Sequence, residues 1–433
     1  MAENEQIPTP VAITQVLKKL VNPGAAQHAT ATEIAGAIAL VFDNKLDRVQ
    51  LALLLWALHS TATDYRPDVL AACATSMRQA ASQVDQAALR EVVRRRAKPE
   101  GQYYGGLCDI VGTGGDGHST YNVSTTASII ASSLLMIAKH GNNSSTSLSG
   151  SADLLLHAKS PSTNKSPVIA ATTPENLVTI YEKTNYAFLY AREWHPGMKY
   201  AAAIRKEIPV RTIFNLMGPL ANPVHDTGLV EARILGVARK DIGLNFAEAL
   251  RLSGSRKAFV VCGDEDLDEL SCAGPTHMWW IHPREGVEET SPELRVDDLE
   301  ITELTISPSD FGLPCHPLDT VHGGKGPSEN AEILMQILRN KRPKDDPVLH
   351  FVLLNTAALI TCSGMCEAEE SQMGEGDDGQ VIKERGPVGL RWKEGLRRAR
   401  WCIESGAALK QFEGFIAATN EAKPDGTSQL TSR

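Results

Sequence analysis

The stretch LCDIVGTGGDG, residues 107–117, decides the fold class of this 433-residue chain. Its first five residues are mostly apolar, and a short apolar run that ends in glycines is typical of a buried parallel strand. A helix is expected next at Ser124–Ser133, followed by a second short strand at Leu134–Ala138. This order of strand, loop, helix and strand predicts a parallel sheet in an α/β fold.

The chain before residue 103 contains helical patterns only. Val11–Leu20 and Asp47–Ser60 carry apolar residues at helical spacing, and Pro67–Gln79 and Ser82–Arg95 continue the pattern. We therefore predict two parts: a small all-helical N-terminal domain over residues 1–100, completed by helices around 195–225, and a larger α/β domain over 101–433.

The larger domain should hold a central, mostly parallel sheet and a helical C-terminal part. Further strands are expected at 188–191, 233–237, 258–262 and 278–281, and helices at 172–183, at 241–252 and from Ser328 onward. Thr172 and Glu175 are expected to form a capping box at the start of the first of these helices. Residues 159–167 and the acidic run 367–379 have the composition of surface insertions, and we expect the second to be mobile.

The charge balance and the cysteines exclude several classes of protein. Acidic residues outnumber basic ones, 52 to 43, so the formal net charge is −9. Nucleic acids and anionic membranes require a basic surface, so neither is expected as a partner. No secretory signal is visible, and the most apolar segments, 51–58 and 351–360, are too short to span a membrane. The eight cysteines lack the spacing of a zinc site. We expect a cytoplasmic protein with buried free thiols.

The loop after the first strand is suited to phosphate. Gly112, Gly114 and Gly115 let backbone amides approach a ligand where a Cβ would obstruct them. The run 122–126, Asn-Val-Ser-Thr-Thr, then places N-cap residues at a helix start, where free amides and the positive end of the helix dipole favour an anion. A tight turn with an ordinary cap would explain the glycines alone, and the ending of a Walker loop is absent. Together, the two features favour a phosphate site.

A second polar loop, Lys139–Asn142, follows the next expected strand. Ligands of parallel sheets bind at the carboxyl ends of the strands, so both loops should face one crevice, with Lys139 supplying positive charge. Thr146, Ser147 and Ser151 add hydroxyl groups before the next helix. A solvated serine-rich loop is the alternative interpretation.

An acidic run, residues 264–269, follows the expected strand at 258–262. Carboxylates crowded at a strand end repel one another unless a cation is present. Mg²⁺ prefers hard oxygen ligands, and the hydroxyl of Ser124 could add one. A solvated acidic turn is the alternative for Asp264, Glu265 and Asp266.

His195 is expected to open a helix that runs to about Glu207 and carries Arg205 near its end. The two residues would then lie roughly 15 Å apart along the helix axis, so one small ring cannot touch both. Arg205 suits capture of a carboxylate, although a salt bridge within the protein is the alternative on position alone.

Taken in order, these motifs resemble those of the anthranilate phosphoribosyltransferases. The resemblance is carried by residues 112–116, 122–125, 139–142, 150–153 and 211–223, with Asp268-Glu269 in the same order, and it runs from about residue 11 to 419. It implies a homodimer joined through the helical parts and a Mg²⁺-dependent reaction. In that reaction the 5-phosphoribosyl group of phosphoribosyl pyrophosphate passes to the amine of anthranilate, in tryptophan biosynthesis. A pyrimidine nucleoside phosphorylase of the same fold is the nearest alternative, and a non-catalytic binding protein is the second.

The resemblance also implies the residues of the site. Phosphoribosyl pyrophosphate would be held by Gly112, Gly115, Asp116, Thr120, Asn122, Val123, Ser124, Thr125, Lys139, His140, Gly141, Asn142, Thr146, Ser147 and Ser151. Anthranilate would be contacted by Gly112, Asn142, His195, Arg205 and Gly218, and Mg²⁺ by Ser124, Asp268 and Glu269. No residue is assigned as a general base. Asn143 and Leu148 stand where basic residues are common in the family, so positive charge is missing near the phosphates.

Overall fold

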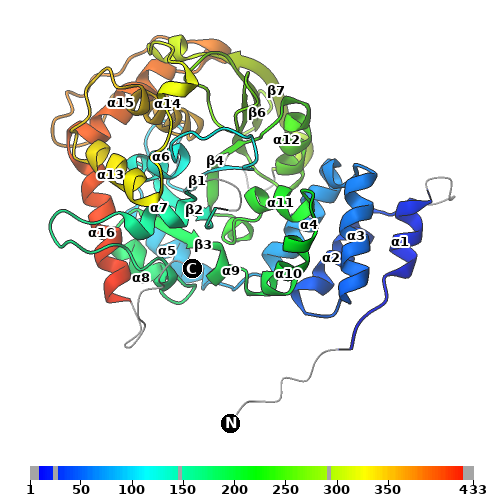
Figure 1. Ribbon diagram of the computed structural model, residues 1–433. Helices are drawn as coiled ribbons and strands as arrows, with labels where there is room; N and C mark the ends of the chain where they lie inside the picture. The colour runs from blue at the N-terminus through cyan, green and yellow to red at the C-terminus, as the bar shows by residue number, and fades with distance from the viewer. Residues whose placement is uncertain (1–8, 23–27, 145–148, 290–293, 423–433) are drawn as a thin grey trace.

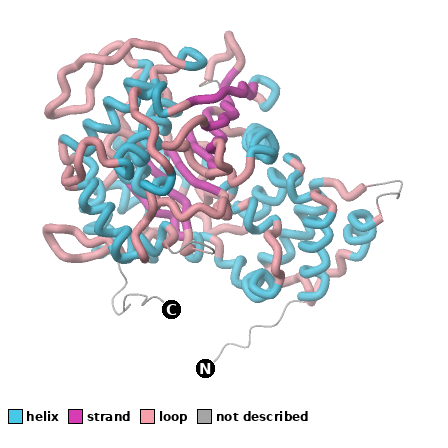
Figure 2. The backbone as a smooth tube through the Cα atoms, turned by 45° about the horizontal axis from the view of Figure 1, so that its top comes forward, coloured by secondary structure: helices cyan, strands magenta, loops and turns pink. Residues whose placement is uncertain are grey.

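The computed structural model describes residues 9–22, 28–144, 149–289 and 294–422. Four N-terminal helices stand beside a larger body that contains all the strands (Figure 1), and Figure 2 shows the strands gathered in the middle of that body. The four helices are α1 (Thr14–Val21), α2 (Ala31–Phe42), α3 (Arg48–Ser60) and α4 (Pro67–Gln79).

The sequence defines the starts of these helices locally. Thr30 and Glu33 form a capping box at α2, and Asp47 accepts hydrogen bonds from the first amides of α3. Pro67 occupies the first position of α4, where a missing N–H costs nothing. Two helices from much later in the chain, α10 (Lys199–Glu207) and α11 (Ile213–Leu216), bury side chains in the same apolar cluster.

Seven strands form one sheet in the order β3-β2-β1-β4-β5-β6-β7. Their bounds are β1 (Leu107–Gly112), β2 (Met136–Gly141), β3 (Tyr186–Tyr190), β4 (Val230–Gly236), β5 (Lys257–Gly263), β6 (Thr276–Pro283) and β7 (Leu299–Ile306). The first five are parallel, whereas β6 and β7 are antiparallel to their neighbours. The predicted fold class, a helical domain with a mostly parallel α/β domain, is confirmed.

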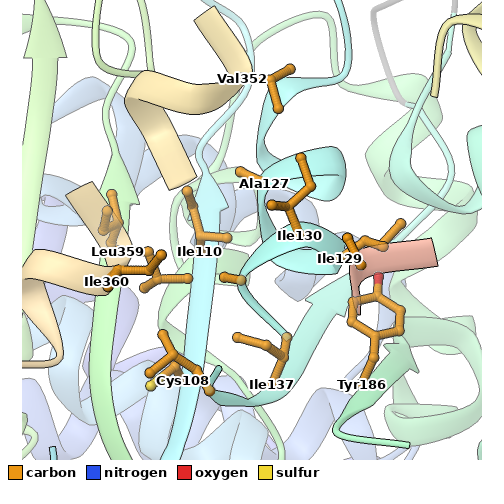
Figure 3. Packing of buried hydrophobic residues seen from close by; sticks show 14 of the residues in the cluster. Cys108, Ile110, Ala127, Ile129, Ile130, Ile137, Tyr186, Val352, Leu359 and Ile360 are labelled. Atoms are coloured by element: carbon orange, nitrogen blue, oxygen red, sulfur yellow. The ribbon is translucent and has the colours of Figure 1, made fainter. Parts of the chain in front are cut away.

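Helices cover both faces of the sheet. Those not yet introduced are α5 (Gln86–Arg96), α6 (Val123–Ala131), α7 (Ser151–His157), α8 (Leu177–Lys183), α9 (Ala191–Trp194), α12 (Gly243–Leu252), α13 (Pro327–Leu338), α14 (Pro347–Cys362), α15 (Trp392–Glu404) and α16 (Ala407–Glu421). On one face, α6 packs against β1 and α14 packs against α6 and β4. Figure 3 shows Ile130, Leu359 and Ile360 in the same apolar cluster as Cys108 and Ile110. On the other face, α12 packs on β5 and also contacts α4 of the helical domain.

The position of α5 bears on the division between the domains. Its Leu89, Val92 and Val93 lie in the core of the α/β domain, and the helix packs against α8. A boundary after residue 100 stays a prediction.

Three local expectations are corrected. The helix expected from Thr172 begins at Leu177, and Thr172 is instead buried in a turn, where its carbonyl accepts a hydrogen bond from Trp194 Nε1. The helix expected from His195 begins instead at Lys199, because a 3₁₀ turn at Pro196–Met198 precedes α10. The edge strand β7 was not predicted, since its half-exposed residues lack a clear alternation of apolar and polar side chains.

The acidic run 367–379 is tied to the rest of the α/β domain by ion pairs. Glu367 pairs with Arg385, and Asp377 pairs with Arg397 at 3.3 Å. These two carboxylates are therefore paired, whereas Glu370, Glu375 and Asp378 of the run are exposed. The mobility expected for this segment stays a prediction.

All eight cysteines are free, and seven of them are buried. Within the described ranges, no helix is both long and apolar enough to cross a lipid bilayer.

Candidate active site

The carboxyl ends of β1, β4 and β5 meet around one acidic side chain, Asp268. A Cβ placed on Gly112, the last residue of β1, would lie 2.9 Å from Asp268 Cγ, and one on Gly236, the last residue of β4, would overlap the Asp268 carbonyl. The Gly114 amide donates a hydrogen bond of 2.6 Å to Asp268 Oδ2. Gly112 thus leaves space for the Asp268 carboxylate, and Gly236 leaves space for the Asp268 backbone.

The glycine loop after β1 has a fixed conformation. Gly114, Gly115 and Gly117 have φ of +64°, +80° and +79°, in the left-handed region that favours glycine. Thr113 anchors the start of the loop, because its amide donates to the Gly236 carbonyl at 2.9 Å and its hydroxyl accepts from the Ala238 amide at 3.2 Å. The loop is therefore held to β4 as well as to β1.

Asp116 of this loop lies close to two further carboxylates, those of Asp268 and Glu269. Burial, and then the charge of Asp116, raise the pKa of Asp268 to about 7. Burial, and then Asp268, raise the pKa of Glu269 well above its ordinary value, although Thr120 Oγ1 donates to Glu269 at 3.4 Å. The ionised pair is thus under-compensated by the protein, as expected for a cation site.

The donor set fits Mg²⁺ better than a transition metal. The groups are hard oxygens, and among the described side chains no three His, Cys, Asp or Glu converge on one metal position. Mg²⁺ commonly takes one or two carboxylates and fills its other positions with water or substrate phosphate. Ser124, the third predicted ligand, lies in the first turn of α6.

The start of α6 is joined to the second loop by hydrogen bonds. The side-chain amide of Asn122 donates to the Ser149 carbonyl at 2.7 Å, and the Thr125 hydroxyl donates to Ser151 Oγ at 2.8 Å. Val123 is fully buried, so it presents only its backbone. The two predicted phosphate loops therefore lie side by side.

Lys139 lies below these loops. Its side chain is 1% exposed, and Nζ donates a hydrogen bond of 2.6 Å to the Ile110 carbonyl of β1. Burial lowers the pKa of Lys139, whereas Asp109, Glu269 and Asp268 raise it. The Lys139 ammonium therefore interacts electrostatically with the carboxylates of Asp268 and Glu269.

The second loop folds around Asp153 of α7. Asp153 accepts hydrogen bonds from Asn143 Nδ2 at 2.5 Å and from the amides of Ser144 and Gly150, both at 2.9 Å. Gly141 leaves no room for a side chain, since a Cβ there would lie 2.6 Å from the Phe188 ring. Asn142 is exposed. Thr146, Ser147 and Leu148 lie outside the described residues.

His140 and His195 form a neutral pair on the helical-domain side of the site. Their rings stand edge to face with centroids 5.1 Å apart, and both are buried. Burial lowers the pKa of each to about 3. The Gly218 backbone lies near the His140 ring, and Nε2 of His140 makes no well-formed hydrogen bond within the described chain. Such weakly basic rings are poor general bases.

Arg205 does not form the internal salt bridge that was the alternative interpretation of this residue. Its guanidinium carbon lies 5.8 Å from the centre of the Phe214 ring, and it pairs with no carboxylate of the described residues. Burial lowers the pKa of this half-buried group. An unpaired guanidinium beside an aromatic ring is suited to a planar, anionic aromatic ligand.

Comparison with known proteins agrees with this geometry. The family model described as "Glycosyl transferase family, a/b domain" matches residues 105–409, and the one described as "Glycosyl transferase family, helical bundle domain" matches 14–81. An anthranilate phosphoribosyltransferase of Schizosaccharomyces pombe is 37% identical over 386 residues, covering 89% of this chain and 91% of that relative. The chain belongs to the anthranilate phosphoribosyltransferase family.

Solved structures of the family extend the likeness. Anthranilate phosphoribosyltransferase from Saccharomyces cerevisiae in complex with PRPP and Mg has a TM-score of 0.72 at 28% identity, and the complex with 4-fluoroanthranilate has 0.71 at 28%. Each match covers 94% of this chain and 98% of the other. Membership of the anthranilate phosphoribosyltransferases decides against the pyrimidine nucleoside phosphorylase and the non-catalytic binding protein.

The sequence analysis missed a buried polar network behind the candidate site. Asp109, fully buried on β1, lies 3.5 Å from Arg233 and accepts a hydrogen bond of 2.9 Å from Asn222. Its other oxygen accepts from the His140 amide at 3.4 Å. The signal was available, since Asp109 is the single charged residue in an apolar strand.

Proposed function

We propose that the glycine loop and the pair Asp268–Glu269 bind phosphoribosyl pyrophosphate with Mg²⁺, while Arg205 binds anthranilate. The reaction is that of the family: transfer of the 5-phosphoribosyl group to the anthranilate amine, with release of pyrophosphate, in tryptophan biosynthesis. The observation that carries this proposal is the placement of Asp268, wedged between Gly112 and Gly236 and bonded to the Gly114 amide.

The donor would be bound by the loops at the carboxyl ends of β1 and β2. The amides of Gly115 and Asp116 and the start of α6 would provide donors for phosphate oxygens, while the amides of Thr113 and Gly114 hold the loop to Gly236 and Asp268. Polar side chains would be added by Thr120, Asn122, Ser124, Thr125 and Ser151. Asp268 and Glu269 would hold Mg²⁺, and when bound the ion would neutralise charge that builds on the leaving pyrophosphate. Asn143 is neutral and does not supply the charge of the arginine common at its position. Its amide instead donates to Asp153 and accepts from the Tyr190 hydroxyl.

The acceptor would enter from the helical-domain side. Arg205 would hold the anthranilate carboxylate, while the neutral rings of His140 and His195 and the backbone at Gly218 line its route. The aromatic amine is a weak nucleophile, so bond breaking at the ribose C1 would lead bond making. Orientation of the amine towards C1 then contributes much of the acceleration, and no side chain is needed as a strong base.

The direct test is a fluorescence assay with the purified full-length chain. Anthranilate fluorescence should decrease after phosphoribosyl pyrophosphate and Mg²⁺ are added together, and should stay constant when either is left out. Release of free base from thymidine or uridine with inorganic phosphate, without any loss of anthranilate, would contradict the proposal.

The surface of α3 supports a homodimer through the helical domain. Val49, Leu53 and Trp56 are 67%, 51% and 54% exposed, and their spacing places them on one side of the helix. Val21 of α1 is also exposed. A contiguous apolar stripe of this kind is typical of a protein interface, and a second copy of the chain is the proposed partner.

The state of the cysteines supports the cytoplasm as the place where this reaction occurs. All eight thiols are unpaired, as expected in a reducing compartment.

A further inference from the structure

We propose that Arg211 is a positioning residue of the donor site, which fixes the glycine loop from the side of the helical domain. The proposal rests on the donor site proposed above and assigns a role to a residue outside that set. Arg211 follows α10 and precedes α11, so it belongs to the segment that also carries Arg205.

The guanidinium of Arg211 lies directly on the backbone of the glycine loop. Its Nη2 donates a hydrogen bond of 3.0 Å to the Thr113 carbonyl. A Cβ placed on Gly115 would lie 2.6 Å from Arg211 Cζ and would overlap Nη1. The absence of a side chain at Gly115 therefore makes room for Arg211 as well as permitting the positive φ.

Arg211 makes no ion pair within 4.0 Å with any carboxylate in the part of the chain that the structure describes. Its field nevertheless reaches Asp268. Arg211 is half-buried and donates its hydrogen bond to the backbone of the glycine loop. It is therefore suited to fix the conformation of that loop.

Arg211 also has a rigid support. The next residue, Thr212, forms a capping box with Asn215 at the start of α11. Phe214 is buried there and packs edge to face on Phe42 of α2, with centroids 6.4 Å apart. The Phe214 ring also lies next to the Arg205 guanidinium. One short segment, residues 205–214, thus connects the acceptor guanidinium to the donor loop.

The first test separates the two substrates. Loss of one charge-assisted hydrogen bond to the loop should raise the KM for phosphoribosyl pyrophosphate about 10- to 100-fold in Arg211→Ala. The KM for anthranilate should stay within about threefold of the wild-type value. Arg211→Lys keeps a charged donor and should recover part of the donor KM, whereas the neutral Arg211→Gln should not. Equal increases in both KM values, or equal defects in the lysine and glutamine variants, would overturn the proposal.

The second test measures the contact itself with a double-mutant cycle. Gly115→Ala should impair donor binding through backbone strain, by about five- to thirty-fold, and further through the clash with Arg211. In the Arg211→Ala background the clash is gone, so the same substitution should cost only the strain. Strictly multiplicative defects in the double variant would show that the two residues act independently and would refute the contact.

Controls distinguish this proposal from the proposed function and from misfolding. Wild-type protein that consumes no anthranilate would end the proposed function, whatever Arg211 does. Thermal unfolding of each Arg211 variant within about 2 °C of wild type shows that the fold is intact. If Arg211→Ala unfolds, the milder variants Arg211→Lys and Arg211→Gln replace it, and the affinity of each for inorganic pyrophosphate with Mg²⁺ is measured. Wild-type pyrophosphate affinity in both variants would overturn the proposal.

Discussion

Replacement of Asp268 by asparagine should stabilise the metal-free protein while it abolishes most of its activity. Asparagine has the size of aspartate, and its side-chain oxygen can still accept the hydrogen bond from the Gly114 amide. What is removed is the negative charge, which burial and Asp116 disfavour.

The sign of the stability effect follows from the direction of the pKa change. The pKa of Asp268 rises from the ordinary 3.8 to about 7 in the folded protein. Above pH 7 the carboxylate is ionised in both the folded and the unfolded state, so burial of its charge lowers the free energy of unfolding by the full amount. This destabilisation shrinks as the pH falls from 7 to about 4. The rise in pKa sets an upper limit of about 4 kcal/mol on this destabilisation. Solvent in the cleft reduces it, and we expect a gain of about 1–2 kcal/mol at pH 8.

The assay is thermal unfolding at pH 8 in EDTA, next to turnover in saturating Mg²⁺ and donor. Asp268→Asn should unfold a few degrees above wild type, and its turnover should fall at least 100-fold. The control is Asp264→Asn, which removes the same charge from the same turn, at a carboxylate that is 55% exposed and paired with Lys240; it should change neither quantity much. A variant less stable than wild type in EDTA, or one with Mg²⁺-dependent turnover near wild type, would refute the reasoning.

Three further substitutions test other parts of the site. Arg205→Ala should raise the anthranilate KM about 10- to 100-fold with a much smaller change in the donor KM, since a lost guanidinium–carboxylate contact is worth about 1.5–3 kcal/mol; equal changes in both would remove its assigned role. Gly112→Ala should suppress turnover at least 100-fold, because the new Cβ displaces the Asp268 carboxylate, and steady-state kinetics that match wild type would contradict the packing described. Leu53→Glu should shift the sedimentation coefficient of a dimer to that of a monomer, because it places a charge in the exposed stripe with Trp56, whereas an unchanged dimer would locate the interface elsewhere.

Much of this site could be predicted because its parts lie at strand ends. The glycine loop and Lys139–Asn142 follow short apolar runs, and parallel strands bring such loops to one edge. Asp268 and Glu269 were distinguished from their acidic neighbours only by the family resemblance. The carboxylates of Asp264 and Asp268 look alike in the sequence, yet one is exposed and the other is enclosed by two strand-ending glycines.

The parts that could not be predicted depend on tertiary contacts. Arg211 contacts a loop 98 residues away in the chain, and nothing in its own segment reveals that partner. The start of α8 was misplaced because Thr172, a good cap by type, is drawn into a buried turn that contacts Trp194. Local propensity gave way in each case to packing that involves distant residues.

The two strand-ending glycines that flank Asp268 limit how this active site can change by mutation. Gly112 and Gly236 belong to different strands, and any larger residue at either position would push the acid out of place. Single substitutions at these two positions therefore cannot reshape the site for a bulkier sugar without displacing Asp268. Productive changes should occur instead in the segment 205–218, which borders the proposed acceptor site and leaves the strand ends untouched.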